Sequence, residues 1–189
     1  MKVEIRNNQI TLDGYVNVTN RDSRTLASPR GKFVEQIMPN AFQRALDGAE
    51  DVDMLFNHDE ERRLGSIKEG NLELREDAIG LKVKATISDP EIVNLAKQNK
   101  LQGWSFGFSN NLDKWEDGSP QRLFVHDLTL YEVSLLSVMP AYTGTSVYTR
   151  SEGDEVLKEI RGFSTFESII DHDKEEEKRM LAVLDEREQ

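Results

Sequence analysis

The chain has 189 residues, which is enough for one domain of ordinary size and a shorter appendage. Its net charge of −11 argues against a nucleic-acid or anionic-membrane partner, since both are bound through Lys and Arg surfaces. Cysteine is absent, which excludes disulfides, thiolate metal sites and a cysteine nucleophile.

The opening residues lack the apolar core of a signal peptide and no later stretch resembles a membrane span, so we expect a cytosolic protein.

Strand patterns dominate the first half of the chain. Residues 9–18, QITLDGYVNV, alternate apolar and polar side chains as a half-buried strand does. Residues 51–59, DVDMLFNHD, form a short apolar run that ends in polar residues. Residues 71–87, NLELREDAIGLKVKATI, indicate a β-hairpin with its turn near 76–78.

Two helices are expected between the strands. In MPNAFQRALDG, Asn40 is a candidate N-cap with Gln43 three residues later, and Gly48 closes the segment. In SDPEIVNLAKQNKLQG, Asp89 is a candidate cap and Pro90 takes the first helical position. The apolar stripe of this second helix is Ile92, Leu95 and Ala96.

The second half of the domain adds the strands that matter most. Residues 103–108, GWSFGF, indicate one strand, and residues 122–138, RLFVHDLTLYEVSLLSV, indicate the longest. Apolar side chains occupy both faces near the end of this longest strand, as in a central strand covered on both sides. The expected fold is therefore a β-rich sheet or barrel with a few helices around it.

The charge is unevenly distributed and suggests a domain boundary. Residues 151–189 hold 13 acidic and 6 basic residues, whereas residues 1–150 hold 22 and 18. We therefore assign 1–150 to a folded domain and 151–189 to an acidic extension, either helical or disordered. The segment FSTFESII favours a helix, because Ser164 and Glu167 can form a capping box and its apolar residues have helical spacing.

A lone serine stands out in the stretch LQGWSFGFS. If the run is a strand, its two faces carry Trp104, Phe106 and Phe108 on one side, and Gly103, Ser105 and Gly107 on the other. Ser105 is then either a nucleophile whose glycine neighbours leave room for a substrate backbone, or an ordinary serine on a solvent-facing strand.

A nucleophilic serine needs a base, and the sequence offers three histidines. His58 ends the apolar run VDMLFNHDE, where strand alternation groups it with the core-facing side chains; it is either this base or a half-exposed strand end. His126 lies inside the long strand, where a surface cross-strand pair would explain it. His172 lies in the acidic segment IIDHDKEEEKR, and no second cluster completes a metal site there, so no metal is expected.

Glu132 is the acid that needs an explanation. It lies within the strongly apolar strand LTLYEVSLLSV, where burial of an unpaired carboxylate would cost several kcal/mol. A histidine is a natural partner for it, whereas an edge-strand position or a Lys or Arg partner would be the ordinary alternative. Asp59 and Asp127 each adjoin a histidine, but neighbouring strand residues point to opposite faces.

Four segments together resemble the prohead proteases of tailed phages, a family similar to the herpesvirus assemblin serine proteases. They are FVEQIMPNAF at 33–42, MLFNHD at 54–59, GWSFGF at 103–108 and LYEVSLLSVMPAY at 130–142. The resemblance covers nearly all of residues 1–150 in the expected order. It implies an α+β, β-rich fold: a mostly antiparallel closed β-barrel surrounded by a few helices, followed by the acidic extension.

The resemblance also implies a serine endopeptidase with a Ser-His-Glu triad. Ser105 matches the nucleophile and His58 the base, while Glu132 falls where the herpesvirus enzymes carry a second histidine. Those relatives have arginines near the oxyanion hole, but VMPAYTGTSVY has none. Backbone amides near Phe106–Gly107 or at Ala141 are then the candidate donors, and Gly103 with Gly107 would line the substrate groove.

The implied role is cleavage of the scaffold protein, of the scaffolding segment of the major capsid protein, and of the protease itself during procapsid maturation. The location would be the immature capsid in the host cytoplasm, with no cofactor required and a homodimer as the expected assembly. Residues 151–189 would be a removable or scaffold-docking segment. The alternative is a non-enzymatic capsid-assembly module on the same fold. An esterase is disfavoured because GWSFG at 103–107, although it has the G-x-S-x-G spacing, is interpreted as a strand and not as the strand-turn-helix elbow of those enzymes.

Overall fold

The computed structural model is β-rich and has two helices within the part of the chain that it describes, residues 2–6, 8–28, 31–137, 156–159 and 167–170. In chain order the elements are β1 (Lys2–Arg6), β2 (Gln9–Val18), β3 (Leu26–Ser28), β4 (Gly31–Ile37), α1 (Ala41–Gly48), β5 (Asp53–Phe56), β6 (Asp59–Ser66), β7 (Leu72–Glu76), β8 (Gly80–Ile87), α2 (Pro90–Lys97), β9 (Gly103–Glu116), β10 (Gln121–Leu136), β11 (Val156–Glu159) and β12 (Glu167–Ile170). The strands expected from the sequence are therefore present.

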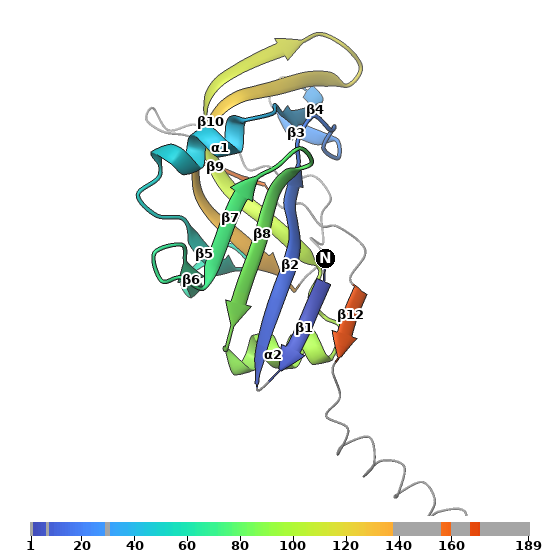
Figure 1. Cartoon of the computed structure of the whole chain (residues 1–189). Helices are drawn as coiled ribbons and strands as arrows, with labels where there is room; N and C mark the ends of the chain where they lie inside the picture. The colour runs from blue at the N-terminus through green and yellow to red at the C-terminus, as the bar shows by residue number, and fades with distance from the viewer. Residues whose placement is uncertain (1, 7, 29–30, 138–155, 160–166, 171–189) are drawn as a thin grey trace, which may run out of the picture.

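The strands form two sheets around one apolar core. The first sheet has the order β12-β1-β2-β8-β7 and lies across the front of Figure 1. The second has the order β11-β9-β10-β4-β3, with β5 and β6 attached to it through β10. Apolar side chains of both sheets, such as Leu12 and Phe106, belong to the same buried cluster. The closed barrel predicted from the sequence is not found: in the described residues no strand pair joins the two sheets.

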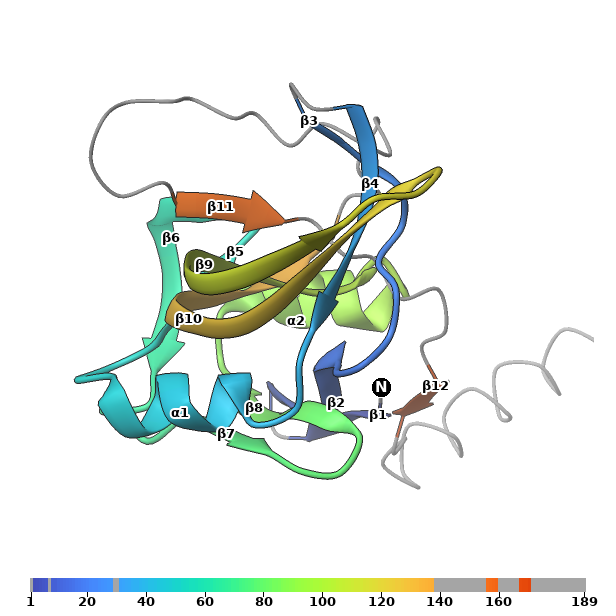
Figure 2. The same ribbon diagram turned by 90° about the horizontal axis from the view of Figure 1, so that it is seen from above.

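Helix α1 contacts both sheets, through β7 of the first and β10 of the second (Figure 2). The carboxylate of Glu76, the last residue of β7, accepts hydrogen bonds from the backbone N–H groups of Asn40 and Gln43 at 2.7 and 2.8 Å. On the other side, Arg44 pairs with Asp127 of β10. Asn40 occupies the predicted N-cap position, but its side chain makes no capping hydrogen bond and Glu76 supplies the acceptor instead.

Helix α2 follows the local prediction. The Asp89 side chain accepts hydrogen bonds from the N–H groups of Glu91 and Ile92, and Pro90 occupies the first turn. Ile92, Val93 and Ala96 are buried, and the helix ends at Lys97, six residues before β9 begins at Gly103. Capping from within the segment explains why the sequence alone was sufficient here.

Strand β10 is the central strand of the second sheet. It pairs along its length with β9 on one edge, and its other edge pairs first with β4 and then with β5, both parallel. Its last five residues are all buried, as the apolar run predicted. The β9–β10 hairpin is long and bent, and its tip projects beyond the two sheets (Figure 1).

Two short strands lie within the predicted acidic extension. β11 pairs antiparallel with Phe106–Ser109 of β9, and β12 pairs parallel with Lys2–Ile5 of β1. Glu167–Ile170 are thus a strand, whereas the sequence favoured a helix there. The rest of 151–189 lies outside the described residues, and the assignment of 151–189 as a separate extension stays a prediction.

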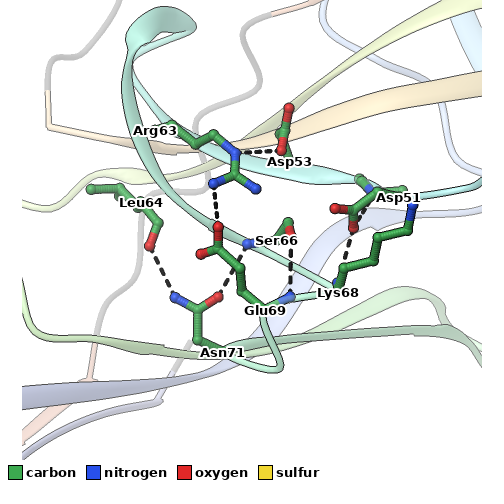
Figure 3. A network of polar contacts seen from close by, with 9 residues as sticks. Asp51, Asp53, Arg63, Leu64, Ser66, Lys68, Glu69 and Asn71 are labelled. Carbon is green, nitrogen blue, oxygen red and sulfur yellow. Dashed lines mark hydrogen bonds and ion pairs between the residues drawn. The ribbon is translucent and has the colours of Figure 1, made fainter.

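A polar network fixes the loop after β6 (Figure 3). The side chain of Asn71 accepts from the N–H of Ser66 and donates to the carbonyl of Leu64. The hydroxyl of Ser66 accepts from the N–H of Glu69 at 3.3 Å, and Arg63 pairs with Glu69 and with Asp53. These contacts anchor the far end of the β5–β6 hairpin, whose near end carries the candidate site.

Candidate active site

The turn between β5 and β6 has an unusual backbone. It consists of two residues, Asn57 and His58, with φ of 55° and 59°. Positive φ at both central positions is the signature of a type I′ turn, which favours Asn followed by Gly. His58 therefore occupies a position where glycine would be relaxed, and such outliers concentrate at functional sites. The sequence placed His58 at a strand end, but β5 stops at Phe56 and His58 lies in the turn.

Contacts with β10 hold this turn in place. The N–H of Asn57 donates to the carbonyl of Leu135 at 2.9 Å. The Asn57 side chain donates to the Ser137 hydroxyl at 3.1 Å and accepts from the Ser137 N–H at 3.0 Å. The strained backbone is thus stabilised by a strand about 80 residues away in the sequence, not by the turn itself.

His58 and Glu132 are in direct contact. The ring Nδ1 of His58 lies 2.6 Å from Oε1 of Glu132, and the two side chains are only 7% and 8% exposed. The second oxygen, Oε2, accepts a hydrogen bond from the Ser134 hydroxyl at 2.8 Å. The same hydroxyl accepts from the N–H of His58 at 3.1 Å. The buried carboxylate therefore has a partner on each oxygen, as burial of a charge requires.

Gly107 makes room for the Glu132 side chain. The two residues face each other across the β9–β10 ladder. A Cβ added at Gly107 would lie 2.6 Å from Oε1 of Glu132, closer than real Cβ atoms approach other heavy atoms. The missing side chain on this face of β9 thus gives the carboxylate the space it needs beside His58.

Ser105 lies on the same face of β9, one alternation before Gly107. Its ladder partner on β10 is Ser134, and directly opposed residues of an antiparallel pair have neighbouring Cβ atoms. Ser105 is fully buried, contrary to the solvent-facing alternative. The opposite face carries Trp104, Phe106 and Phe108, all buried in the core. The alternation in GWSFGF therefore separates a packing face from a face with polar groups.

Two buried polar atoms of this cluster make no hydrogen bond to any residue that the structure describes. They are Oγ of Ser105 and Nε2 of His58. Buried polar atoms are nearly always paired, so each unpaired one calls for an explanation. Because Nδ1 of His58 faces Glu132, Nε2 is the ring nitrogen left for a substrate or a nucleophile. Hydrogen bonds therefore join His58, Glu132 and Ser134, and Ser105 is the ladder partner of Ser134.

Comparison with known proteins identifies the family. The sequence profile described as caudovirus prohead serine protease matches residues 1–159, well over half of the chain. The chain belongs to this family. It is also 34% identical over 88 residues to the prohead protease of Escherichia phage T5, a match that covers 45% of this chain and 40% of that protein.

No solved structure matches the chain. The similarity to the herpesvirus assemblin enzymes therefore stays a prediction. The chain spans about two fifths of the length of the T5 prohead protease that it matches.

The other histidine and the two aspartates that the structure of this prohead protease family member describes make hydrogen bonds or ion pairs of their own. His126 is on β10, six residues before Glu132, and its carbonyl accepts a hydrogen bond from Arg44. Asp127 pairs with Arg44, and Asp59 accepts from the N–H of Glu61. His172 and Ala141 lie outside the described residues.

The predicted oxyanion donors lie in the middle of a sheet. Phe106 and Gly107 are flanked by β10 on one edge and by β11 on the other. In an antiparallel sheet successive N–H groups point to opposite edges, so one of these two points toward β11. Gly103, the first residue of β9, is buried and has φ of 150°.

Within the described ranges, no group of three His, Asp or Glu side chains is arranged to hold a metal ion. No helix of the described part is both long and apolar enough to cross a membrane.

Sequence reasoning missed two residues that support the cluster, Asn57 and Ser134. Alternation along β10 could have found Ser134, because it shares the Glu132 face two residues later. The usual type I′ dipeptide is Asn-Gly. The turn at Asn57 and His58 could therefore have been predicted only by assuming that His58 takes the glycine position.

Proposed function

We propose that this chain is a serine endopeptidase in which Ser105 is the nucleophile, His58 the general base and Glu132 the acid that orients the histidine. One observation carries the proposal. Nδ1 of His58 is bound to buried Glu132, while Nε2 of His58 and Oγ of nearby Ser105 are buried and unpaired among the described residues. Membership of the prohead serine protease family supports the same assignment.

The proposed reaction has two steps. Nε2 of His58 takes the hydroxyl proton of Ser105 while Oγ attacks the scissile carbonyl, and the resulting imidazolium gives the proton to the leaving amine. Water, deprotonated by the same nitrogen, then hydrolyses the acyl-enzyme and releases Ser105. The Glu132 carboxylate holds the Nδ1–H tautomer and stabilises the imidazolium throughout. Ser105 Oγ and His58 Nε2 make no hydrogen bond to each other, and such contacts often tighten only when a substrate binds.

Backbone amides near Phe106–Gly107 or at Ala141 would stabilise the oxyanion. A donor at Phe106 or Gly107 needs the N–H that points toward β11, because the other one faces β10 within the ladder. Gly103 and Gly107 would flank an extended substrate. Gly107 also has a structural role, because its missing side chain leaves room for Glu132.

The proposed substrates are the capsid scaffold protein, the scaffolding segment of the major capsid protein, and the chain itself. The proposed setting is the immature capsid in the host cytoplasm, with 151–189 as a removable or scaffold-docking segment and a homodimer as the active assembly. The family description and the T5 relative, whose name is prohead protease, support the procapsid setting.

The decisive experiment co-expresses the chain with its scaffold protein and follows cleavage by mass spectrometry. Ser105→Ala and His58→Ala should each lower specific cleavage by at least about 1,000-fold, because the nucleophile and base act as a unit. Ser109→Ala is the matched control: it is on the same strand and face, but its hydroxyl is bonded to Tyr131. Undiminished cleavage by either triad variant would exclude the proposed mechanism.

A non-enzymatic capsid-assembly module is the second candidate, since the same fold could bind a scaffold without turnover. A covalent serine-directed probe separates the two functions. Labelling of the wild-type chain at Ser105, absent in Ser105→Ala and reduced in His58→Ala, supports the enzyme. A chain that binds scaffold but takes up no label would favour the assembly module.

A further inference from the structure

Ser134 contacts both partners of Ser105 in the proposed triad. Its hydroxyl donates to Oε2 of Glu132 at 2.8 Å and accepts from the backbone N–H of His58 at 3.1 Å. Ser134 is itself fully buried, so water does not compete for these bonds. We infer that Ser134 is a positioning residue that aligns Glu132 with His58; this inference rests on the proposed protease function.

The Glu132 side chain needs such a constraint. A carboxylate held only by the 2.6 Å contact with Nδ1 could still rotate about its terminal bond, since this torsion has a broad minimum. The Ser134 hydroxyl fixes the second oxygen, and Gly107 provides the space into which the group fits. Together they determine which oxygen faces the histidine.

The turn that carries His58 needs the same constraint. His58 has φ of 59°, and a non-glycine residue in that region persists only where the surroundings determine its conformation. The Ser134 hydroxyl is the acceptor for the His58 N–H, so it fixes the backbone of the turn as well as the acid. One side chain therefore sets the relative positions of the base and its orienting group.

The position of Ser134 also explains why only one of two facing serines is free. Ser105 and Ser134 are ladder partners, and both are fully buried. The hydroxyl proton of Ser134 is committed to Glu132, whereas Oγ of Ser105 has no partner among the described residues. Ser105 is therefore the hydroxyl that remains for Nε2 of His58 to activate.

The test compares Ser134→Ala, Ser134→Thr and Ser134→Cys with wild type in steady-state cleavage of a scaffold-derived peptide. We expect Ser134→Ala to lower kcat by about 10-fold to 100-fold, because small misplacements of catalytic groups have effects of that size, with KM changed less than about twofold. Ser134→Thr keeps the hydroxyl and should recover most of kcat. Ser134→Cys keeps the volume but is a weaker donor and acceptor, so it should lie between Thr and Ala and serves if Ala fails to fold.

Ser66→Ala is the matched control. Ser66 is equally buried and its hydroxyl also accepts from a backbone N–H, but its partner is Glu69 in the network of Figure 3. It should lower the melting temperature without changing kcat. A kcat of Ser134→Ala equal to that of wild type, or a loss no larger than that of Ser66→Ala, would overturn the inference.

A second measurement needs no turnover. The proton on Nδ1 of His58, bound to Glu132 at 2.6 Å, should give a downfield resonance in the NMR spectrum of the full chain. We expect it to move upfield or to broaden in Ser134→Ala, to persist in Ser134→Thr and to be unaffected in Ser66→Ala. If the wild-type chain cleaves nothing, the proposed function fails, and this resonance still decides the role of Ser134: an unchanged signal in Ser134→Ala would reject it.

Discussion

Two hairpin turns of this protein differ in the contacts that hold them in place. The β7–β8 turn has hydrogen bonds of its own: the Asp77 carboxylate accepts from the N–H groups of Ile79 and Gly80, and its backbone N–H donates to the carbonyl of Gly80. Tyr15 and Thr19 add bonds to Asp77 and Ile79 from outside the turn. The β5–β6 turn places two non-glycine residues at positive φ, and its supports are Ser134 and Leu135 of β10 and Ser137 directly after it.

The difference separates a turn that serves stability from one that serves a site. A turn with internal hydrogen bonds and glycine at its end is close to relaxed, and the neighbouring Glu76 stabilises α1. A turn supported by a distant strand carries strain, but it delivers His58 to Glu132 in a fixed orientation. Substitutions around the first turn should therefore alter stability, and those around the second should alter activity.

Outside the proposed triad, the largest effect is expected at Gly107. In Gly107→Ala the new Cβ would meet Oε1 of Glu132 at 2.6 Å, and the carboxylate, which is the flexible end of a side chain, must move away from His58. Cleavage should fall by about 100-fold while the fold is retained. Gly80→Ala is the counterpart in the other hairpin: its Cβ would meet the backbone carbonyl of Asn17. It should lower the free energy of unfolding by about 1–3 kcal/mol and leave kcat within about twofold.

A smaller effect is expected at Asn57. Asn57→Ala removes both side-chain bonds to Ser137 and leaves alanine at φ of 55°, so stability should fall by about 2–3 kcal/mol and kcat by about 10-fold. Asn57→Asp keeps the acceptor for the Ser137 N–H and should lose less of both. Urea unfolding and kinetics on the same samples provide the measurement. A variant with unchanged kcat despite lost stability would place this turn in the same class as β7–β8.

The cap of α1 should affect stability alone. Glu76→Ala leaves the N–H groups of Asn40 and Gln43 without their acceptor and should lower the free energy of unfolding by about 1 kcal/mol. Asp89→Ala, which removes the cap of α2, is the matched variant and should lose a similar amount. A loss of cleavage in Glu76→Ala beyond about twofold would contradict the division between the two hairpins.

The smallest effect concerns acid stability. The N–H of Ile79, followed by the Tyr15 hydroxyl and the N–H of Gly80, holds the pKa of Asp77 below its usual value. A lowered folded-state pKa contributes stability above the unfolded value of about 3.9, and this contribution is lost as pH falls through the folded pKa. The melting temperature of Asp77→Asn should therefore fall less than that of wild type below about pH 3.9. Asp117→Asn, at an exposed position in the β9–β10 turn, should follow wild type.

Sequence reasoning succeeded where the determinants are local. The alternation in QITLDGYVNV gave β2, and Asp89 with Pro90 gave the start of α2, because each pattern is complete within a few residues. It failed at the start of α1, whose capping carboxylate is Glu76, 36 residues after Asn40. The closed barrel was also wrong: among the described residues the strands form two sheets, and pairing between distant strands is not fixed by local patterns.

The site was only partly readable from the sequence. The argument that a carboxylate inside an apolar strand needs a partner pointed to Glu132, and its contact with His58 is present in the structure. The geometry that brings His58 to Glu132 could not be predicted. It depends on the parallel pairing of β5 with the end of β10 and on a turn with positive φ. The roles of Ser134 and Gly107 follow from the β9–β10 register, which alternation alone does not fix.

The placement of Glu132 and Ser134 on β10 has a consequence for hydrogen exchange. Here β10 has paired neighbours on both edges, β9 on one and β5 on the other. Backbone amides in such a segment become exposed to deuterium only through opening of a large part of the sheet. The acid and its support should thus lie among the most slowly exchanging residues, whereas the amides of β7, at an edge of the first sheet, should exchange sooner.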